Sequence, residues 1–525
     1  MTTLYDIMIT HVGEAAIAGA PRSQEPVREL CIPREVFETG ARAMKGAGAR
    51  LVAEWGVDET LLARGFALFA CYAREREYLL VRCDLPEADP TFPSLTMKYI
   101  PAFRFERQIH SLMGLVPTGH VHSDLRPWIK FEDWPPDAWP LRKSFAIDQR
   151  LPRVAGDYRW ARATGEGVYE IPVGPVHAGI IEPGHFRFQA VGEDIINLEE
   201  RLGYVHKGIE KRFELLAPSD GARLAGRVSG DSTVGHALTY CRALEALCGC
   251  QPPERALWLR ALFLELERIA NHLGDIGAIA NDAAFAIVLF QLSRLKERLL
   301  RLNHKLFGHR YLMDRIVPGG VSVDLPQDGA DRIEQELSWL GGEFERIITI
   351  YDESPSLEDR LRSTGILTPE LALELGTVGY VARASGQHLD CRIQTPFPPY
   401  DRIQPREIVL NSCDVHARAW VRVEEIRDSL RLIIELLDSL PSGEISARCG
   451  PLPKDSSSFS VVEGWRGEIV YWLQSGAQGE INRCMIRDPS SVNWLGLEQA
   501  VLGNIVPDFP LCNKSFNQSY SGNDL

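Results

Sequence analysis

Apolar residues spaced alternately three and four positions apart dominate the middle and later parts of the chain. The three clearest runs lie within residues 259–276, 285–306 and 419–440. Such spacing places the apolar side chains on one face of an α-helix, and that face must be buried against a neighbour. The pattern therefore predicts three long helices packed side by side as a bundle.

Strand patterns occur mainly before these runs. Short strands are predicted at residues 78–83, 168–173 and 186–191. A segment rich in proline and tryptophan, residues 131–140, cannot form a continuous helix because proline lacks the amide donor. We therefore predict an α+β chain, in which a small N-terminal α/β domain (1–150) precedes a mainly helical-bundle domain with a small β-sheet (151–525).

Composition limits the partners. The 525 residues carry a formal net charge of −14, which disfavours nucleic acid as a partner. The most apolar short run, Ala283–Phe290, is far shorter than the ~20 residues of a membrane-spanning helix. The N-terminus lacks the pattern of a secretory signal. We expect an intracellular protein without a direct membrane span, attached to the inner face of the cell membrane only through its partners.

The 11 cysteines are scattered, and none form a C-x-x-C pair. Their spacing matches neither zinc nor iron–sulfur ligation. Scattered cysteines in a long intracellular chain are usually small buried apolar residues. We therefore expect no metal or cluster, and no other cofactor, in this chain itself.

Two sets of ordered motifs resemble known families. Phe103–His110 (FRFERQIH), His122–Arg126 (HSDLR) and Pro140–Lys143 (PLRK) resemble the 30-kDa subunit of complex I. Beyond residue 165 the chain resembles the large subunits of group 4 [NiFe] hydrogenases, which are homologous to the 49-kDa subunit of complex I. The matching stretches are Val173–Gly179, Tyr204–Lys211, Glu267–Asp275, Val317–Val321 and Glu463–Glu468.

The resemblance implies that the first domain docks the second to its neighbours. It also implies two kinds of partner, which are a small iron–sulfur subunit with a [4Fe-4S] cluster and membrane ion-translocating subunits.

The resemblance also identifies the positions at which the hydrogenases hold nickel and iron with two cysteine pairs. In the first motif, R-x-C-G-x-C-x-x-x-H, Ser229 and Ser232 replace both cysteines, and in the second, D-P-C-x-x-C, Ser490 and Asn493 do so. Nickel and low-spin iron require soft, ionised thiolates, whereas a serine hydroxyl stays protonated and an asparagine amide is a weak neutral ligand. We therefore expect no [NiFe] centre and no hydrogenase activity.

Polar residues remain around the four changed positions. Glu210 matches a proton-handling glutamate of the hydrogenases, Arg466 matches their pocket arginine, and His236 and Asp488 belong to the two motif frames. His236 lies one helical turn after Ser232 if this segment is a helix. These four residues are the candidate catalytic pocket, which could relay protons or bind a small polar ligand. The alternative is a polar core whose groups only satisfy each other.

Complex I uses the same cleft for quinone. His177 matches the first histidine of its quinone loop and is the candidate residue for binding a quinone-type acceptor. Ile181 stands where the second, quinone-facing histidine belongs, and Pro218 stands where the quinone-facing tyrosine belongs.

Two functions from different classes fit the sequence. One is a redox-complex subunit that couples electron transfer from a neighbouring iron–sulfur subunit to proton movement, or to reduction of a quinone-type acceptor. The other is a non-catalytic assembly scaffold of such a complex. An open cavity lined by all four candidate residues would favour the first, and a filled, dry cleft would favour the second.

Overall fold

The computed structural model describes residues 2–16, 22–24, 27–129, 134–135, 137–152, 154, 158–176 and 181–525. It has an α+β architecture, as predicted. The N-terminal part is built on a five-stranded sheet in the order β1-β2-β5-β4-β3, in which only β2 and β5 pair in parallel. Its strands are β1 (Arg22–Gln24), β2 (Val27–Cys31), β3 (Arg50–Asp58), β4 (Phe66–Arg74) and β5 (Glu77–Leu85).

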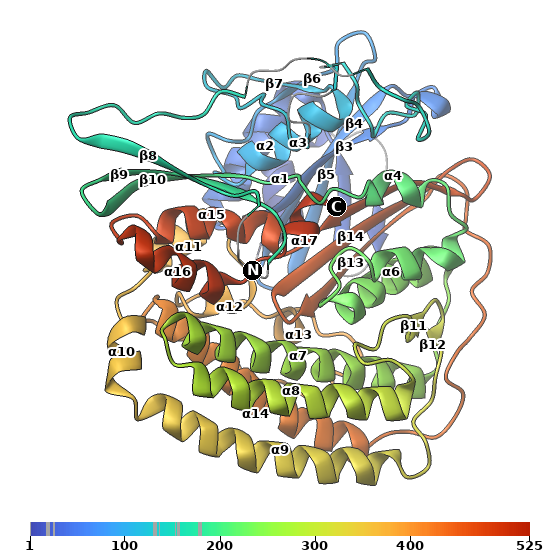
Figure 1. Cartoon of the computed structure of the whole chain (residues 1–525). Coiled ribbons are helices and arrows are strands. Elements are labelled where there is room, and N and C mark those ends of the chain that lie inside the picture. The colour runs from blue at the N-terminus through green and yellow to red at the C-terminus, as the bar shows by residue number, and fades with distance from the viewer. Residues whose placement is uncertain are drawn as a thin grey trace.

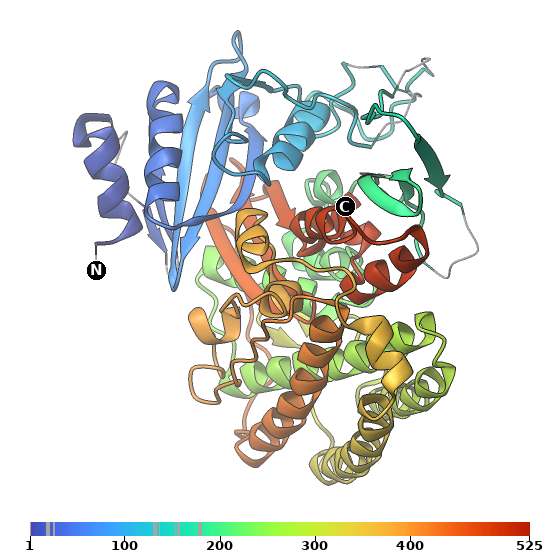
Figure 2. The ribbon, with the colours of Figure 1, turned by 90° about the vertical axis from the view of Figure 1, so that its left-hand side faces the viewer.

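Helices cover one face and one edge of this sheet. α1 (Leu4–Val12) and α2 (Arg34–Gly46) pack on one face, where Figure 2 shows them beside the blue strands. α3 (Ala102–Met113) packs along β3, the edge strand. In sequence, α3 connects two short strands, β6 (Thr91–Pro93) and β7 (Val116–Thr118), which pair with each other in parallel.

The other face of the sheet packs against a second sheet from the end of the chain. That sheet consists of the antiparallel strands β13 (Ser457–Gly464), β14 (Gly467–Ser475) and β15 (Ile481–Arg487). The ring of Trp472 lies 5.6 Å from Trp55 and 4.8 Å from Phe69, centroid to centroid. One apolar cluster therefore joins the two parts of the chain, and the division near residue 150 stays a prediction.

The three predicted helices are confirmed, and a fourth long helix joins them. They are α7 (Glu254–Asp282), α8 (Ala286–Phe307) and α14 (Val415–Asp438), with α9 (Gly329–Asp352) as the fourth. The four helices form the lower layer of the molecule in Figure 1. The apolar seam predicted on α7 is fully buried, and Leu259, Leu266 and Leu273 have no exposed surface.

Short elements connect the bundle to the two sheets. A three-stranded sheet formed by β8 (Val168–Val173), β9 (His185–Val191) and β10 (Asp194–Arg201) projects from one side of the molecule, and β8 and β9 agree with the predicted strands. The remaining helices and the hairpin are α4 (Ile209–Phe213), α5 (Gly221–Ala225), α6 (Thr233–Cys248), β11 (Ile316–Val317), β12 (Gly320–Val321), α10 (Pro355–Leu361), α11 (Pro369–Glu374), α12 (Gly379–Arg383), α13 (Cys391–Gln394), α15 (Ser490–Ala500), α16 (Phe509–Phe516) and α17 (Tyr520–Asp524).

Among the residues that the structure describes, none of the helices combines the length and the apolar character that are needed to cross a lipid bilayer.

Candidate functional site

The four candidate residues come from four separate segments and are all buried. Glu210 lies in the first turn of α4 and His236 in the first turns of α6, whereas Arg466 lies in the β13–β14 turn and Asp488 directly after β15. Their exposed fractions are 5%, 0%, 3% and 1%, respectively. Burial at this level requires each polar group to find a partner inside the protein.

His236 lies in a chain of three side chains. Its Nε2 is 2.9 Å from Asp488 Oδ2, and its Nδ1 is 3.1 Å from the hydroxyl of Tyr471. The amide of His236 donates to the carbonyl of Ser232, so these two residues are one helical turn apart, as the spacing predicted. Burial alone would raise the pKa of Asp488, but the hydrogen bond and charge of His236, together with Arg466, hold it below its usual value.

Arg466 forms an ion pair with Asp231, a residue that the sequence analysis did not single out. Its two terminal nitrogens donate to the two carboxylate oxygens of Asp231 over 2.6 and 2.7 Å. A third bond goes to Ser232 Oγ at 3.2 Å, and Nε donates to the carbonyl of Asn517 at 2.8 Å. Burial opposes the ionisation of Asp231, but the charge and hydrogen bonds of Arg466, together with the hydrogen bond from Ser229, outweigh it and lower the pKa of Asp231 to about 2. Asp231 stands between Ser229 and Ser232, the two changed positions of the first motif. This position in the motif could have identified Asp231 as a residue of the site.

The changed cysteine positions are tied together by hydrogen bonds. Ser229 Oγ lies 2.7 Å from Asp231 Oδ1 and 2.8 Å from the hydroxyl of Ser519. The backbone amide of Ser519 donates to Ser490 Oγ at 2.9 Å. The side-chain amide of Asn493 bonds instead to the backbone amide and carbonyl of Val378. The structure thus brings Ser229 and Ser490 into one cluster, whereas the recorded bonds of Asn493 lead away from it.

The segment that meets the first motif belongs to α17. Ser519 caps this helix by accepting the amide of Gly522, and the two residues have the spacing of a C-x-x-C pair. Gly522 packs so tightly on Asp488 that a β-carbon at this position would lie 2.5 Å from the carboxylate carbon. The sequence pattern did not single out Ser519 and Gly522, because Asp488-Pro489-Ser490 reproduces the D-P start of the second motif.

These donors do not fit a nickel–iron group. Serine hydroxyls are hard, neutral ligands, and those of Ser229, Ser490 and Ser519 already bond to one another or to neighbouring groups. In the described part of the chain, no cluster of three or more histidine, cysteine, aspartate and glutamate side chains is arranged to hold a metal ion.

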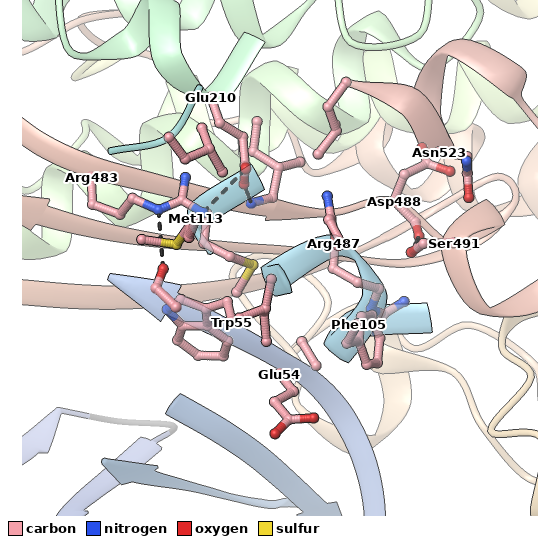
Figure 3. Close-up of a pocket in the computed structure, with 18 of the residues that line it drawn as sticks. Glu54, Trp55, Phe105, Met113, Glu210, Arg483, Arg487, Asp488, Ser491 and Asn523 are labelled. Atoms are coloured by element: carbon pink, nitrogen blue, oxygen red, sulfur yellow. Dashed lines mark hydrogen bonds and ion pairs between the residues drawn. The ribbon is translucent and has the colours of Figure 1, made fainter. Parts of the chain in front are cut away.

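Glu210 and Asp488 line a small cavity that His236 and Arg466 do not reach. It offers about 30 Å³ to water-sized molecules, enough for roughly two waters. Figure 3 shows Glu210 near Arg483 on one wall, and Glu54 and Trp55 from β3 on the other. Glu210 Oε2 accepts a hydrogen bond from Arg483 over 3.1 Å, and its Oε1 accepts the amide of Ile486 over 3.0 Å. Of the four candidate residues, Glu210 and Asp488 therefore line the cavity, whereas His236 and Arg466 lie in the closed interior.

The candidate quinone residue, His177, lies outside the described residues. Ile181, which follows soon after it in the sequence, lines a mainly apolar cavity of about 490 Å³, whose wall also includes Phe186 and Leu289. This volume is within the range of small-molecule sites. Pro218 begins a short 3₁₀ turn, and its carbonyl accepts the hydroxyl of Tyr240. Neither Ile181 nor Pro218 offers the side-chain donor that complex I places there.

Comparisons with known proteins agree with these features. The family model for the 49-kDa subunit of respiratory-chain NADH dehydrogenase matches residues 282–454, and the model for its 30-kDa subunit matches residues 30–151. Formate hydrogenlyase subunit 5 of Escherichia coli is 30% identical over 485 residues, which cover 91% of this chain and 85% of that protein. The carbon monoxide-induced hydrogenase of Rhodospirillum rubrum is 32% identical over 67% of this chain and 98% of its own.

A related fusion and a solved structure extend these matches. In Bacteroides thetaiotaomicron, the C/D fusion protein of NADH-quinone oxidoreductase is 29% identical over 74% of this chain and 76% of its own. A protein in the structure of the membrane-bound sulfane sulfur reductase, an archaeal respiratory membrane complex, superposes with a TM-score of 0.65 at 25% identity. That match covers 69% of this chain and 100% of the other. The chain therefore belongs to the family that unites the large subunits of hydrogenase and formate hydrogenlyase complexes with the 49-kDa subunits of NADH dehydrogenase, and it has a 30-kDa-type domain in the same polypeptide.

Proposed function

We propose that this chain is the large subunit of a membrane-associated redox complex in which a polar, metal-free site exchanges protons as electrons reach a neighbouring iron–sulfur subunit. The observation that carries the proposal is the hydrogen-bonded chain of Tyr471, His236 and Asp488. Asp488, at the end of this chain, lines the same cavity as Glu210. Imidazole and carboxylate groups in hydrogen-bond contact are the usual means by which proteins move protons.

Hydrogen activation is not part of this proposal. The four ligand positions carry three serine hydroxyls and the amide of Asn493, and Ser229 bonds to Ser519. Without thiolates, a nickel–iron group has no soft donors in this cleft.

The partners are proposed from the relatives. Relatives are named as subunits of a formate hydrogenlyase and of NADH-quinone oxidoreductases, which are assemblies of several proteins. We propose that this chain binds a small subunit with a [4Fe-4S] cluster, and that membrane ion-translocating subunits anchor the assembly at the inner face of the cell membrane.

The electron acceptor is proposed by class. The cavity of about 490 Å³ beside Ile181 is mainly apolar and has the size of a small-molecule site. It favours a lipophilic, quinone-type acceptor over a charged one. Because Ile181 and Pro218 replace the headgroup donors of complex I, such an acceptor would be held differently from quinone in that enzyme.

A scaffold without chemistry is the second candidate, and one observation favours it. His236 has no exposed surface, and Arg466 is bound to Asp231. Ser519 lies between the two motifs, where it bonds to Ser229 and Ser490. A filled cleft is what a subunit retained for its shape would have.

Replacing Glu210 by glutamine in the native complex separates the two candidates. Glutamine keeps the shape and can still accept the amide of Ile486, but it cannot release a proton. We expect normal assembly and a loss of proton-coupled turnover of roughly 100-fold, the scale of a lost acid–base group. The matched control is Glu193→Gln, an exposed position at the β9–β10 turn. Unchanged turnover in Glu210→Gln would leave the scaffold as the better account.

A further inference from the structure

A second cavity lies where α3, β10 and α15 meet, and it shares no residue with the cavity in Figure 3. It has about 140 Å³ of space, which is enough for several water molecules. Arg104 and Arg107 line it from α3, Glu199 and Glu200 from β10, and Glu498 from α15. None of these residues belongs to the four candidates discussed above.

Glu200 is the unusual member of this group. Its side chain has no exposed surface, and neither carboxylate oxygen has a hydrogen-bond partner among the described residues. The nearest recorded charge is Arg104, whose Nη1 lies 3.7 Å from Oε2. A buried carboxylate without donors is strongly disfavoured, so Glu200 requires either water from the cavity or a bound proton.

Glu498 lies directly against Glu200. Its Oε1 accepts the backbone amide of Glu200 over 3.1 Å. Burial raises the pKa of both residues, and the charge of Glu498 raises the pKa of Glu200 further, while Arg104 opposes these effects. The Glu498 carboxylate therefore lies close enough to the carboxyl group of Glu200 for the two charges to repel each other. Two carboxyl groups coupled in this way do not both ionise easily, so the pair retains one proton.

The other charges around the pair are already matched. Arg107 donates to the carbonyls of Arg126 and Pro127, and Glu199 accepts from Arg126. Besides the pair, the charged groups that line the cavity are Arg104 and Arg107 on α3, Arg126 in the following loop and Glu199 on β10. Tyr520 on α17 does not line the cavity, but burial and the charge of Glu200 raise its pKa. Arg104 is thus the cation that faces the pair. If the pair keeps one proton, it carries a single negative charge, and the positive charge of Arg104 balances it.

Arg104 also connects this cavity to the site already described. Its Nη2 donates to Asn523 Oδ1 over 3.2 Å. Asn523 lines the first cavity together with Asp488 and Glu210, as Figure 3 shows. Arg104 and Asn523 therefore link the Glu200–Glu498 pair to the wall of the first cavity, where a change of charge on the pair is felt in a medium of low dielectric.

We propose that the cavity between α3, β10 and α15 is a proton-storage site, in which the coupled pair of Glu200 and Glu498 holds one exchangeable proton. Release breaks one carboxyl O–H bond, leaves the electron pair on the carboxylate and transfers the proton to water in the cavity. Binding of this proton does not depend on the redox role. Its use in turnover rests on the proposed function.

Infrared spectroscopy of the full chain tests the proposal. A protonated carboxyl group gives a carbonyl band that shifts in D₂O, and this pair should lose part of that band as pH rises above the ordinary glutamate range of about 4. Other buried acids such as Glu54 and Glu267 contribute to the band. The assignment therefore comes from the difference between wild type and variants.

Three variants decide the outcome. Glu200→Gln and Glu498→Gln each leave one carboxylate beside Arg104, so each should lose the titrating component, and the double variant must lose it. Glu193→Gln should retain it in full. An unchanged titrating component in the double variant would overturn the proposal, and the single variants provide the test if the double variant does not fold.

Failure here is distinguishable from failure of the proposed function. If the double variant loses the band while Glu210→Gln in the native complex keeps full turnover, the storage site stands and the redox role falls. If the band is unchanged while Glu210→Gln stops turnover, the storage site falls and the redox role stands.

Discussion

Alanine at position 522 is expected to loosen the segment that fills the cleft. The β-carbon of Gly522→Ala would lie 2.5 Å from the carboxylate carbon of Asp488 and 2.6 Å from one of its oxygens. Ordinary contacts at such atoms begin at about 3.4 Å, so one partner must move by nearly 1 Å. Asp488 cannot move freely because it is bound to His236, and the displacement therefore falls on residues 519–525.

The size of the effect follows from two opposing contributions. Overpacking at a buried position costs about 1–3 kcal/mol. Alanine in place of glycine within a helix returns up to about 1 kcal/mol. We expect a net loss of about 1–2 kcal/mol, which raises the population of the opened segment roughly 5- to 30-fold.

Amide hydrogen exchange measured by mass spectrometry reports this opening directly. Peptides covering residues 515–525 should exchange faster by that factor in Gly522→Ala. Gly230→Ala is the matched control, because Gly230 belongs to the same cluster but an added β-carbon there meets no atom within 4 Å. Equal exchange in both variants would refute the close packing of α17 on Asp488.

Three further outcomes are expected. Arg50 from β3 donates to Glu468 on β14 over 2.9 Å. Arg50→Met should therefore lower the free energy of unfolding by about 2–3 kcal/mol in denaturant titrations. The loss is smaller than the full cost of an unpaired buried charge because Arg487 still pairs with Glu468. Burial opposes ionisation of Glu468, but Arg50 and Arg487 lower its pKa from 4.5 to about 2. The resulting stability, roughly 3 kcal/mol, is present above about pH 4.5 and lost as pH falls toward 2; Glu468→Gln should flatten this acid limb. Asp488→Asn should retain assembly but lower proton-coupled turnover roughly 100-fold in the native complex, and a wild-type rate would remove Asp488 from the proton route.

Much of the fold could be predicted because burial on a helix leaves a repeating trace. The seams of α7, α8 and α14 were visible as alternating spacings of three and four. α9 has the same trace at Ile333, Leu337, Leu340 and Phe344, all buried, and the same reasoning could have found it. The apposition of two sheets around Trp472 could not be predicted, since strand alternation states which side is apolar and not what covers it.

The site was predictable only where its contacts are local. The one-turn spacing of Ser232 and His236 is a property of a single helix, and the structure reproduces it. The pairing of Arg466 with Asp231 joins segments far apart in sequence, and no periodicity encodes such a contact. The same holds for Ser519, which meets Ser229 only because the end of the chain folds back onto the segment that precedes α6.

The closed geometry of the cleft favours proton exchange over the binding of a ligand inside it. His236 has no exposed surface. Among the described residues, its two ring nitrogens form hydrogen bonds to the side chains of Asp488 and Tyr471. A substrate could reach His236 only if the buried segments around it moved, whereas a proton can pass along the existing hydrogen bonds. Of the two contacts of His236, only Asp488 lines the cavity that also holds Glu210. The edge of that cavity is therefore where a proton would enter or leave.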